Sequence, residues 1–277
     1  MTDAVAWSGM GAMGAPMSRQ LEAAGYQVRA VSLRPGRDPR AVAEALKDVV
    51  AVFTCLPGPP EVRDAWTGPG GLLESAPAGA VLVDVSTTGP ALAEELAATA
   101  AQRGFAALDC PVSGGPQGAA AGTLAVMAGG DEAAIERVRP MLDAFGTVHV
   151  CGGPGAGQTV KLINQAAITG INGALGMAYA LTVRSGISPD LVHGVLAGGA
   201  ARGFLTDMLW PRMAADELEG GFAVQHMIKD IRLCRELAGE LKLPTGLLDV
   251  VEDWYRKAQA ECGDSLATQA IGKGVLA

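Results

Sequence analysis

The chain of 277 residues is 49% apolar and carries a formal net charge of −8, so it can form one large domain or two ordinary ones around a substantial core. The acidic balance argues against nucleic acid or an anionic membrane surface as a partner, because both bind clustered Lys and Arg, but it is compatible with a small acidic substrate. The five cysteines are odd in number and show neither CxxC spacing nor a neighbouring histidine pattern, which predicts reduced thiols in a cytoplasmic protein, with no metal site.

The first half of the chain alternates short apolar runs, which are typical of strands, with helical patterns. The expected strands cover residues 4–7, 28–33, 49–55, 81–85, 105–109, 123–128 and 147–150. The expected helices begin near residue 12 and after Asp38, an N-cap followed by Pro39, and cover residues 90–102 and 131–145. This alternation predicts a doubly wound, mostly parallel sheet with helices on both faces. An acidic residue near the N-terminus, where a signal peptide has basic residues, predicts no export.

A glycine turn stands between the first expected strand and the first expected helix. It reads GxGxxG and consists of Gly9, Met10, Gly11, Ala12, Met13 and Gly14. The first glycine permits a sharp turn, the second lets the backbone approach a pyrophosphate, and the third lets helix and strand pack closely. The helix N-terminus offers unpaired N–H groups to phosphates. In this context the pattern predicts a dinucleotide-binding unit of the Rossmann type; the alternative is a packing turn without nucleotide.

The end of the second expected strand bears on the choice between NAD and NADP. An acidic residue there bonds the ribose 2′-OH of NAD, whereas its absence beside arginines favours the 2′-phosphate of NADP. Residues 31–37 contain no acidic residue. We therefore predict that NADP is preferred, without excluding NAD, and that Ser32, Arg34 and Arg37 contact the phosphate. The alternative is that these arginines are solvated loop residues.

The pattern changes to helices after residue 151. Residues 152–157 form a glycine and proline hinge, and helices are expected over residues 158–185, 189–196, 224–241 and 245–260. The sequence thus predicts a dinucleotide-binding domain over residues 1–157, followed by an all-α domain for substrate binding and oligomerisation over residues 158–277.

The first of these later helices is uncharged between Lys161 and Arg184, which is long enough for a membrane span. Asn164, Gln165 and Asn172 interrupt this stretch, and polar groups are costly in lipid. We therefore expect a long buried helix and no membrane. Because exposed apolar surface is usually covered by a partner, we also expect a homodimer or homotetramer.

Lys161 and Asn164 are three residues apart on this helix and therefore share a face. A lone charge at the head of an otherwise uncharged helix requires an explanation, because burial without a partner is costly. In a cleft, Lys161 would face a substrate, and a lowered pKa would let it exchange a proton near neutral pH. The alternative is that Lys161 lies in a solvated first turn.

Together these motifs resemble the β-hydroxyacid dehydrogenases, which include 3-hydroxyisobutyrate dehydrogenase and tartronate semialdehyde (2-hydroxy-3-oxopropionate) reductase. Four motifs in order support the resemblance over essentially the whole chain. They are the glycine turn with its extension to Met17, the run from Asp109 to Gly115, the pattern Gly155-x-Gly157-x-x-x-Lys161-x-x-Asn164, and the pair Lys229-Asp230.

The resemblance implies a role for each position that matches the family's motifs. Lys161 would be the catalytic acid/base, and Asn164 would orient that lysine or the substrate hydroxyl. The other implied positions are Ser113, Gly114 and Gly115 for the substrate carboxylate, Lys229 for substrate and cofactor in a cleft, and Leu56, Pro57, Ser86 and Thr87 along the cofactor.

Some features depart from the family pattern. Gln165 stands where many relatives have Asn, and Asn164 followed by Gln165 resembles the tartronate semialdehyde reductases. The loop after the second strand lacks the usual Asn-Arg-Thr, and the tail over residues 262–277 lacks the usual acidic pattern.

The resemblance implies hydride transfer between a nicotinamide cofactor and a small hydroxyacid or semialdehyde acid. Tartronate semialdehyde, 3-hydroxyisobutyrate, succinic semialdehyde and glyoxylate are the candidate substrates. Two alternatives stay open on the same fold: an imine reductase, although these enzymes usually replace the catalytic lysine, and a non-catalytic nucleotide-binding scaffold.

Overall fold

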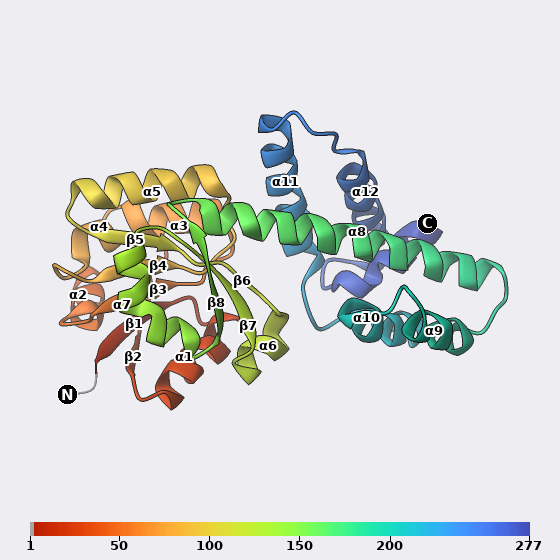
Figure 1. The fold of residues 1–277 in the computed structure, drawn as a ribbon, viewed down its shortest axis with the longest axis horizontal. Coiled ribbons are helices and arrows are strands. Elements are labelled where there is room, and N and C mark those ends of the chain that lie inside the picture. The colour runs from red at the N-terminus through yellow and green to blue at the C-terminus, as the bar shows by residue number, and fades with distance from the viewer. Residues whose placement is uncertain (1–2) are drawn as a thin grey trace. The chain divides into compact units, whose positions relative to one another are not determined.

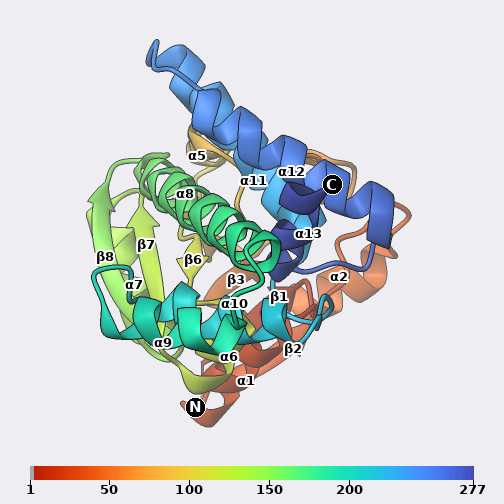
Figure 2. The same ribbon diagram turned by 90° about the vertical axis from the view of Figure 1, so that its right-hand side faces the viewer.

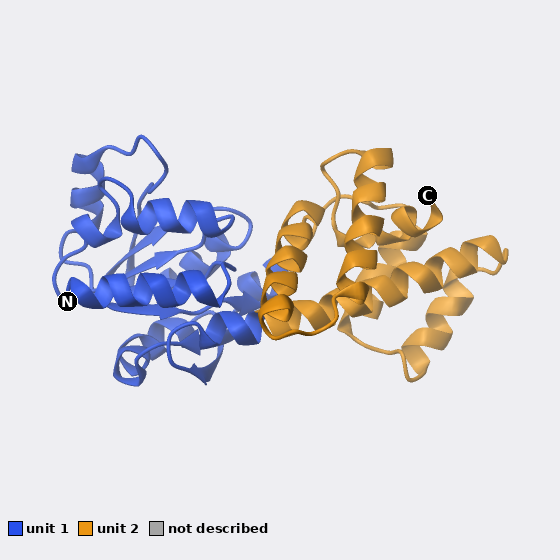
Figure 3. Ribbon diagram, turned by 90° about the horizontal axis from the view of Figure 1, so that it is seen from above, with its two compact units in different colours: residues 1–161 blue, residues 162–277 orange. Residues whose placement is uncertain are grey.

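The computed structural model describes residues 3–277 and contains two compact units, the first ending at Lys161 and the second beginning at Leu162 (Figure 3). The division lies four residues after the boundary expected at residue 157. Helix α8 (Ala156–Arg184) runs through this point without a break. The expected hinge over residues 152–157 therefore consists of a strand end, a short turn and the first residues of α8.

Unit 1 is built on an eight-stranded sheet in the order β2-β1-β3-β4-β5-β7-β6, and β8 pairs with β7. Its strands are β1 (Ala4–Ser8), β2 (Gln27–Ala30), β3 (Ala51–Thr54), β4 (Val81–Asp84), β5 (Ala106–Asp109), β6 (Val112–Ser113), β7 (Leu124–Gly129) and β8 (Gly146–Gly152). All pairs are parallel except those that β5 and β6 make with β7. The doubly wound, mostly parallel sheet is confirmed.

Helices cover both faces of this sheet (Figures 1 and 2). They are α1 (Gly14–Ala23), α2 (Pro39–Leu46), α3 (Pro59–Thr67), α4 (Leu72–Ser75), α5 (Pro90–Gln102), α6 (Gly115–Ala121) and α7 (Glu132–Asp143). One apolar core packs α1, α6 and α7 against the sheet, and a second packs α2 to α5 against the other face. The side chain of Asp38 accepts a hydrogen bond from the N–H of Arg40, so the expected N-cap of α2 is confirmed.

Unit 2 is helical in the part of the chain after Lys161. Besides the greater part of α8 it contains α9 (Pro189–Gly198), α10 (Phe204–Ala214), α11 (Val224–Glu240), α12 (Gly246–Cys262), the 3₁₀ helix η1 (Thr268–Ala270) and α13 (Ile271–Leu276). Its core includes the fully buried rings of Trp210 and Tyr255.

The expectation that α8 is buried is wrong for one side of the helix. Ile163 and Leu181 are more than half exposed, and Ile171 is also exposed. Among the described residues, α8 is the one helix with the length and hydropathy of a membrane span, and 39% of its most apolar stretch is buried. Core helices of water-soluble proteins share these properties, so length and hydropathy alone do not assign a membrane.

Candidate active site

The glycine turn is packed tightly on its inner side and open on its outer side. Gly9 has a φ of +98°, and a Cβ there would lie 2.0 Å from the carbonyl oxygen of Cys55. A Cβ on Gly14 would lie 1.8 Å from the carbonyl oxygen of Gly9, so the start of helix α1 touches the backbone of the residue that directly follows strand β1. A Cβ on Gly11, in contrast, would have nothing within 4 Å. The turn therefore leaves backbone accessible at the start of α1, where a pyrophosphate would fit.

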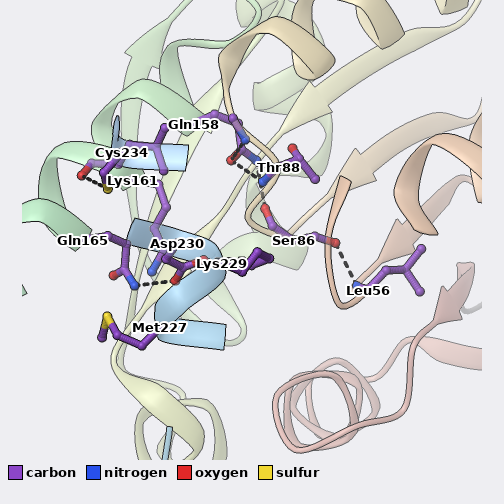
Figure 4. A network of polar contacts seen from close by, with 12 residues as sticks. Leu56, Ser86, Thr88, Gln158, Lys161, Gln165, Met227, Lys229, Asp230 and Cys234 are labelled. Carbon is purple, nitrogen blue, oxygen red and sulfur yellow. Dashed lines mark hydrogen bonds and ion pairs between the residues drawn. The ribbon is translucent and has the colours of Figure 1, made fainter. Parts of the chain in front are cut away.

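A buried polar network joins the ends of β3 and β4. Asp84 Oδ1 accepts hydrogen bonds from the hydroxyls of Thr54 at 2.8 Å and of Ser86 at 2.6 Å. The hydroxyl of Ser86 also accepts from the N–H of Leu56 at 2.8 Å (Figure 4). Two expected cofactor positions, Leu56 and Ser86, are thus held together at the carboxyl ends of neighbouring parallel strands, whereas Pro57 is exposed and Thr87 half-buried nearby in the sequence.

The loop after β2 holds its two arginines in different environments. Ser32 and Arg34 are exposed. The side chain of Arg37 is only 4% exposed, and its guanidinium forms an ion pair with Asp64 of α3. Arg37 is therefore engaged within unit 1, and Ser32 and Arg34 are the members of the expected set that face solvent.

Lys161 lies in the second turn of α8, and its residue is 6% exposed. Its Nζ donates a hydrogen bond to the carbonyl oxygen of Val112 at 2.7 Å. Val112 directly precedes the expected substrate residues Ser113, Gly114 and Gly115. The alternative of a solvated first-turn lysine is wrong, because the ammonium group is buried beside this segment.

The segment after β6 turns sharply at its glycines. Gly114 has a φ of +136°, and a Cβ there would lie 2.9 Å from a methyl group of Leu124. Glycine is the residue that this conformation favours, since L side chains rarely adopt it. The turn leads directly into α6, so the N–H groups of this helix start follow Val112 and Ser113 immediately in the chain.

Two buried polar residues where β5 meets the start of α8 were not expected as site residues. Asp109 accepts hydrogen bonds from the N–H groups of Gly155 and Gln158, each at 2.8 Å. Burial raises the pKa of Asp109 to about 6, with a smaller upward effect from the charge of Asp84, while the two N–H groups act in the opposite direction. Asp109 belongs to one of the recognised motifs, but Gln158 has no sequence signal that distinguishes it from any other polar residue.

Unit 2 contains a second network, which includes two expected site residues. Asn164 Nδ2 donates to Gln165 Oε1 at 3.0 Å. Gln165 Nε2 in turn donates to Asp230 Oδ2 at 2.6 Å (Figure 4). The Nζ of Lys229 lies 3.1 Å from Asp230 Oδ1. Asn164 and Lys229 are therefore linked through Gln165 and Asp230. Within residues 3–277 there is no cluster of three or more His, Cys, Asp or Glu side chains that would hold a metal ion.

The fold and the glycine turn define a dinucleotide-binding protein, and comparison with known proteins agrees. Residues 4–153 match the family described as the NAD binding domain of 6-phosphogluconate dehydrogenase. Residues 155–274 match the family described as the NAD-binding domain of NADP-dependent 3-hydroxyisobutyrate dehydrogenase.

Individual relatives cover almost the whole chain. An uncharacterized oxidoreductase of Synechocystis sp. is 36% identical, over 96% of each chain. The 2-hydroxy-3-oxopropionate reductase of Escherichia coli is 31% identical, over 95% of this chain and 94% of its own. The solved structure of Mycobacterium tuberculosis 3-hydroxyisobutyrate dehydrogenase with L-serine is 30% identical, covers 100% of both chains and superposes with a TM-score of 0.85.

These matches show that the chain belongs to the family of NAD(P)-dependent hydroxyacid dehydrogenases, as the four motifs predicted. The protein is therefore an oxidoreductase of this family, acting on the CH–OH group of donors. An imine reductase of Pseudomonas sp. is similar at only 19% identity, with a TM-score of 0.57, so this likeness shows the fold alone.

Proposed function

We propose that the enzyme transfers a hydride between NADP(H) and a small carboxylic acid with a β-hydroxyl or aldehyde group, with Lys161 as the general acid/base. The observation that supports this most directly is the buried Lys161 ammonium group, 2.7 Å from the carbonyl oxygen of Val112 and next to the turn over residues 113–115. Tartronate semialdehyde, 3-hydroxyisobutyrate, succinic semialdehyde and glyoxylate are the proposed substrates. L-Serine, present in the related solved structure, is likewise an acid with a β-hydroxyl.

In this proposal each residue of the site has a separate role. When bound, the nicotinamide supplies or accepts the hydride. The turn of Ser113, Gly114 and Gly115 binds the substrate carboxylate through its hydroxyl and backbone N–H groups. In its protonated form Lys161 donates a proton to the carbonyl oxygen during reduction, and in its neutral form it accepts the proton of the hydroxyl during oxidation.

Two further residues complete the proposed site. Asn164 orients the lysine or the substrate hydroxyl, and Lys229 contacts substrate and cofactor. The pyrophosphate binds at the turn over residues 9–14, where Gly11 leaves the backbone open. The remainder of the dinucleotide follows the strand ends at Leu56, Pro57, Ser86 and Thr87.

Replacing Lys161 tests the mechanism. Lys161→Met keeps the length of the side chain but removes its proton, so kcat should fall by about 10²- to 10⁴-fold, the range of general acid–base catalysis. The measurement is steady-state kinetics on a panel of the four candidate acids, each assayed together with the other member of its alcohol/aldehyde couple. Cofactor affinity, measured by fluorescence titration, should stay within about twofold.

Lys257→Met is the matched control, because Lys257 lies on α12 in an exposed ion pair with Asp253. It should leave turnover unchanged on every substrate. Wild-type turnover in Lys161→Met would remove Lys161 from the mechanism, and activity on none of the panel would refute the substrate class.

The preference for NADP rests on the loop after β2. This loop has no acidic residue for a ribose 2′-OH, and it exposes Ser32 and Arg34. A charged hydrogen bond to the 2′-phosphate is worth about 1.5–3 kcal/mol, so Arg34→Ala should lower kcat/KM for NADPH relative to NADH by about 10- to 100-fold. Arg37→Ala should change the ratio less, because Arg37 already pairs with Asp64. A wild-type preference for NADH would refute the proposal.

We also propose that the enzyme is a cytoplasmic homodimer or homotetramer. The apolar side chains exposed on α8 support association between copies, since surfaces of this kind are usually buried against a partner. The cytoplasmic location rests on the cysteine pattern of the sequence and stays a prediction.

A further inference from the structure

The first turn of α8 is capped by a residue from outside the helix. Gly155, Ala156 and Gly157 provide no polar side chain at this helix start. Instead, Asp109 Oδ1 accepts from the N–H of Gly155 and Oδ2 accepts from the N–H of Gln158, both at 2.8 Å. A carboxylate in this position satisfies otherwise unpaired N–H groups and complements the positive end of the helix dipole. The start of α8 is thereby attached to the end of β5.

The side chain of Gln158 attaches the same turn to the segment after β4. Its Oε1 accepts from the N–H groups of Thr88 at 2.9 Å and Gly89 at 3.2 Å, and its Nε2 donates to the carbonyl oxygen of Ser86 at 2.8 Å (Figure 4). The residue has no exposed surface. All three hydrogen bonds lie in the interior of unit 1, where the loss of a hydrogen-bond partner lowers stability more than it would at the surface.

Backbone packing removes the remaining freedom of this turn. A Cβ on Gly157 would lie 2.3 Å from the carbonyl oxygen of Met127 and 2.4 Å from that of Asp109. A Cβ on Gly129 would lie 2.6 Å from the backbone nitrogen of Gly157. The helix start therefore lies directly against β5 and β7, and it cannot slide along the sheet without a steric clash.

We propose that Asp109 and Gln158 are positioning residues for Lys161. Lys161 follows Gln158 by three residues and so lies on the same side of α8. Its partner Val112 follows Asp109 by three residues, so the two hydrogen bonds to Asp109 fix both the helix that carries Nζ and the segment that Nζ contacts. Displacing a catalytic group by about 1 Å can cost about 10²-fold in rate. This inference rests on the proposed role of Lys161.

We call the hydrogen bonds of Asp109 and Gln158 around the start of α8 the clamp. The test compares two variants of this clamp with a control on the same helix. Asp109→Asn keeps one acceptor oxygen and loses the other, and Gln158→Met keeps the volume but loses all three hydrogen bonds. The control, Asn172→Leu, removes a buried amide that donates to the hydroxyl of Tyr255 at 3.0 Å in unit 2. The readouts are kcat, cofactor Kd, and hydrogen exchange at the N–H groups of Gly155 and Gln158 in the enzyme without cofactor.

Both clamp variants should lower kcat by about 10- to 100-fold, and the first-turn N–H groups should exchange at least about tenfold faster. Asp109→Asn should leave cofactor Kd within about twofold, whereas Gln158→Met should also weaken cofactor binding, because Gln158 holds the segment after β4. Asn172→Leu should lower Tm but leave kcat and first-turn exchange unchanged. Clamp variants that behave like Asn172→Leu would overturn the proposal.

Gln158→Glu covers the case in which neither clamp variant folds. It keeps the side-chain size and the oxygen that accepts from Thr88 and Gly89, but it replaces the donor to Ser86 by a second oxygen and adds a negative charge. A folded Gln158→Glu protein with kcat at least about fivefold below wild type would support the proposal, and wild-type kcat would overturn it. A different result would refute the proposed function, namely wild-type turnover in Lys161→Met. If Lys161→Met is inactive and Asp109→Asn is fully active, only the positioning role of Asp109 is overturned.

Discussion

Asp109 has a buried carboxyl group at the end of β5, opposite Asp84 on the neighbouring strand β4. Desolvation by burial, and secondarily the charge of Asp84, raise its pKa from 3.8 to about 6, even though two N–H groups stabilise the charged form. Because the folded pKa is the higher one, the folded protein binds this proton more tightly than the unfolded chain. Its contribution to stability is therefore complete below pH 3.8 and is lost as the pH rises through about 6.

Asp109→Asn should remove this pH dependence, because Asn stays neutral at every pH. Between pH 5 and 7.5 the wild type should lose about 1 kcal/mol of unfolding free energy more than the variant, since one pKa unit corresponds to about 1.4 kcal/mol. Urea denaturation of both proteins at the two pH values measures the difference. Asp264→Asn, which changes an exposed carboxylate, is the control and should follow the wild type. Parallel pH profiles for wild type and Asp109→Asn would contradict the prediction.

At this scale, the sequence identified residues whose chemistry is local and missed those whose role depends on the fold. Lys161 stood out as a lone charge in an apolar helix, and the structure places its Nζ beside the expected substrate turn. Gln158 did not stand out, because its partners Thr88 and Ser86 lie 70 and 72 residues away in the chain. Hydrogen bonds over such separations are set by strand order, which residue spacing does not reveal.

At the scale of elements, substitutions at two glycines of the glycine turn should separate an effect on folding stability from an effect on cofactor binding. Gly14→Ala should destabilise the protein by about 1–3 kcal/mol, because its Cβ would clash with the carbonyl oxygen of Gly9. Gly11→Ala should change stability by less than about 0.5 kcal/mol, since nothing lies within 4 Å of the added methyl group. The same methyl group would meet the pyrophosphate, so cofactor Kd should rise at least about tenfold.

Thermal unfolding and cofactor titration of both variants check this pair. Each glycine serves as the control for the other, because the same substitution is made three residues apart in one turn. Equal loss of stability in both variants would show that Gly11 also packs against protein, and an unchanged Kd in Gly11→Ala would place the pyrophosphate elsewhere.

The elements that the sequence predicted are those with a strong periodic signal. Strands β3 and β4 are buried along their whole length and appear as continuous apolar runs, as expected for parallel strands covered on both faces. Helices α3 and α6 were missed, because glycine and proline at their starts are also the residues of turns. Helix α10 was missed as well, since Pro211 interrupts its pattern.

At the scale of the whole molecule, the exposed apolar surface of unit 2 requires an explanation. Leu181 of α8 is 61% exposed, and Leu191 and Val195 of α9 are 64% and 66% exposed. Apolar side chains of this size exposed on two consecutive helices favour association with a partner. This surface could be covered by a second copy of the chain or by a lipid bilayer. The proposed homodimer or homotetramer means that a second copy covers it.

Charged substitutions on this surface should distinguish the two occupants. Wild type should elute as a dimer or tetramer in size-exclusion chromatography with light scattering, and Leu181→Glu combined with Leu191→Glu should shift it toward monomer, because a buried unpaired carboxylate is costly. Val150→Glu, at an exposed position of β8 in unit 1, is the control and should keep the wild-type mass. If the wild type is a monomer that co-sediments with phospholipid vesicles, the apolar surface binds a membrane and not a second copy. If it is a monomer that does not bind vesicles, the apolar surface is exposed to water and the proposed assembly is refuted.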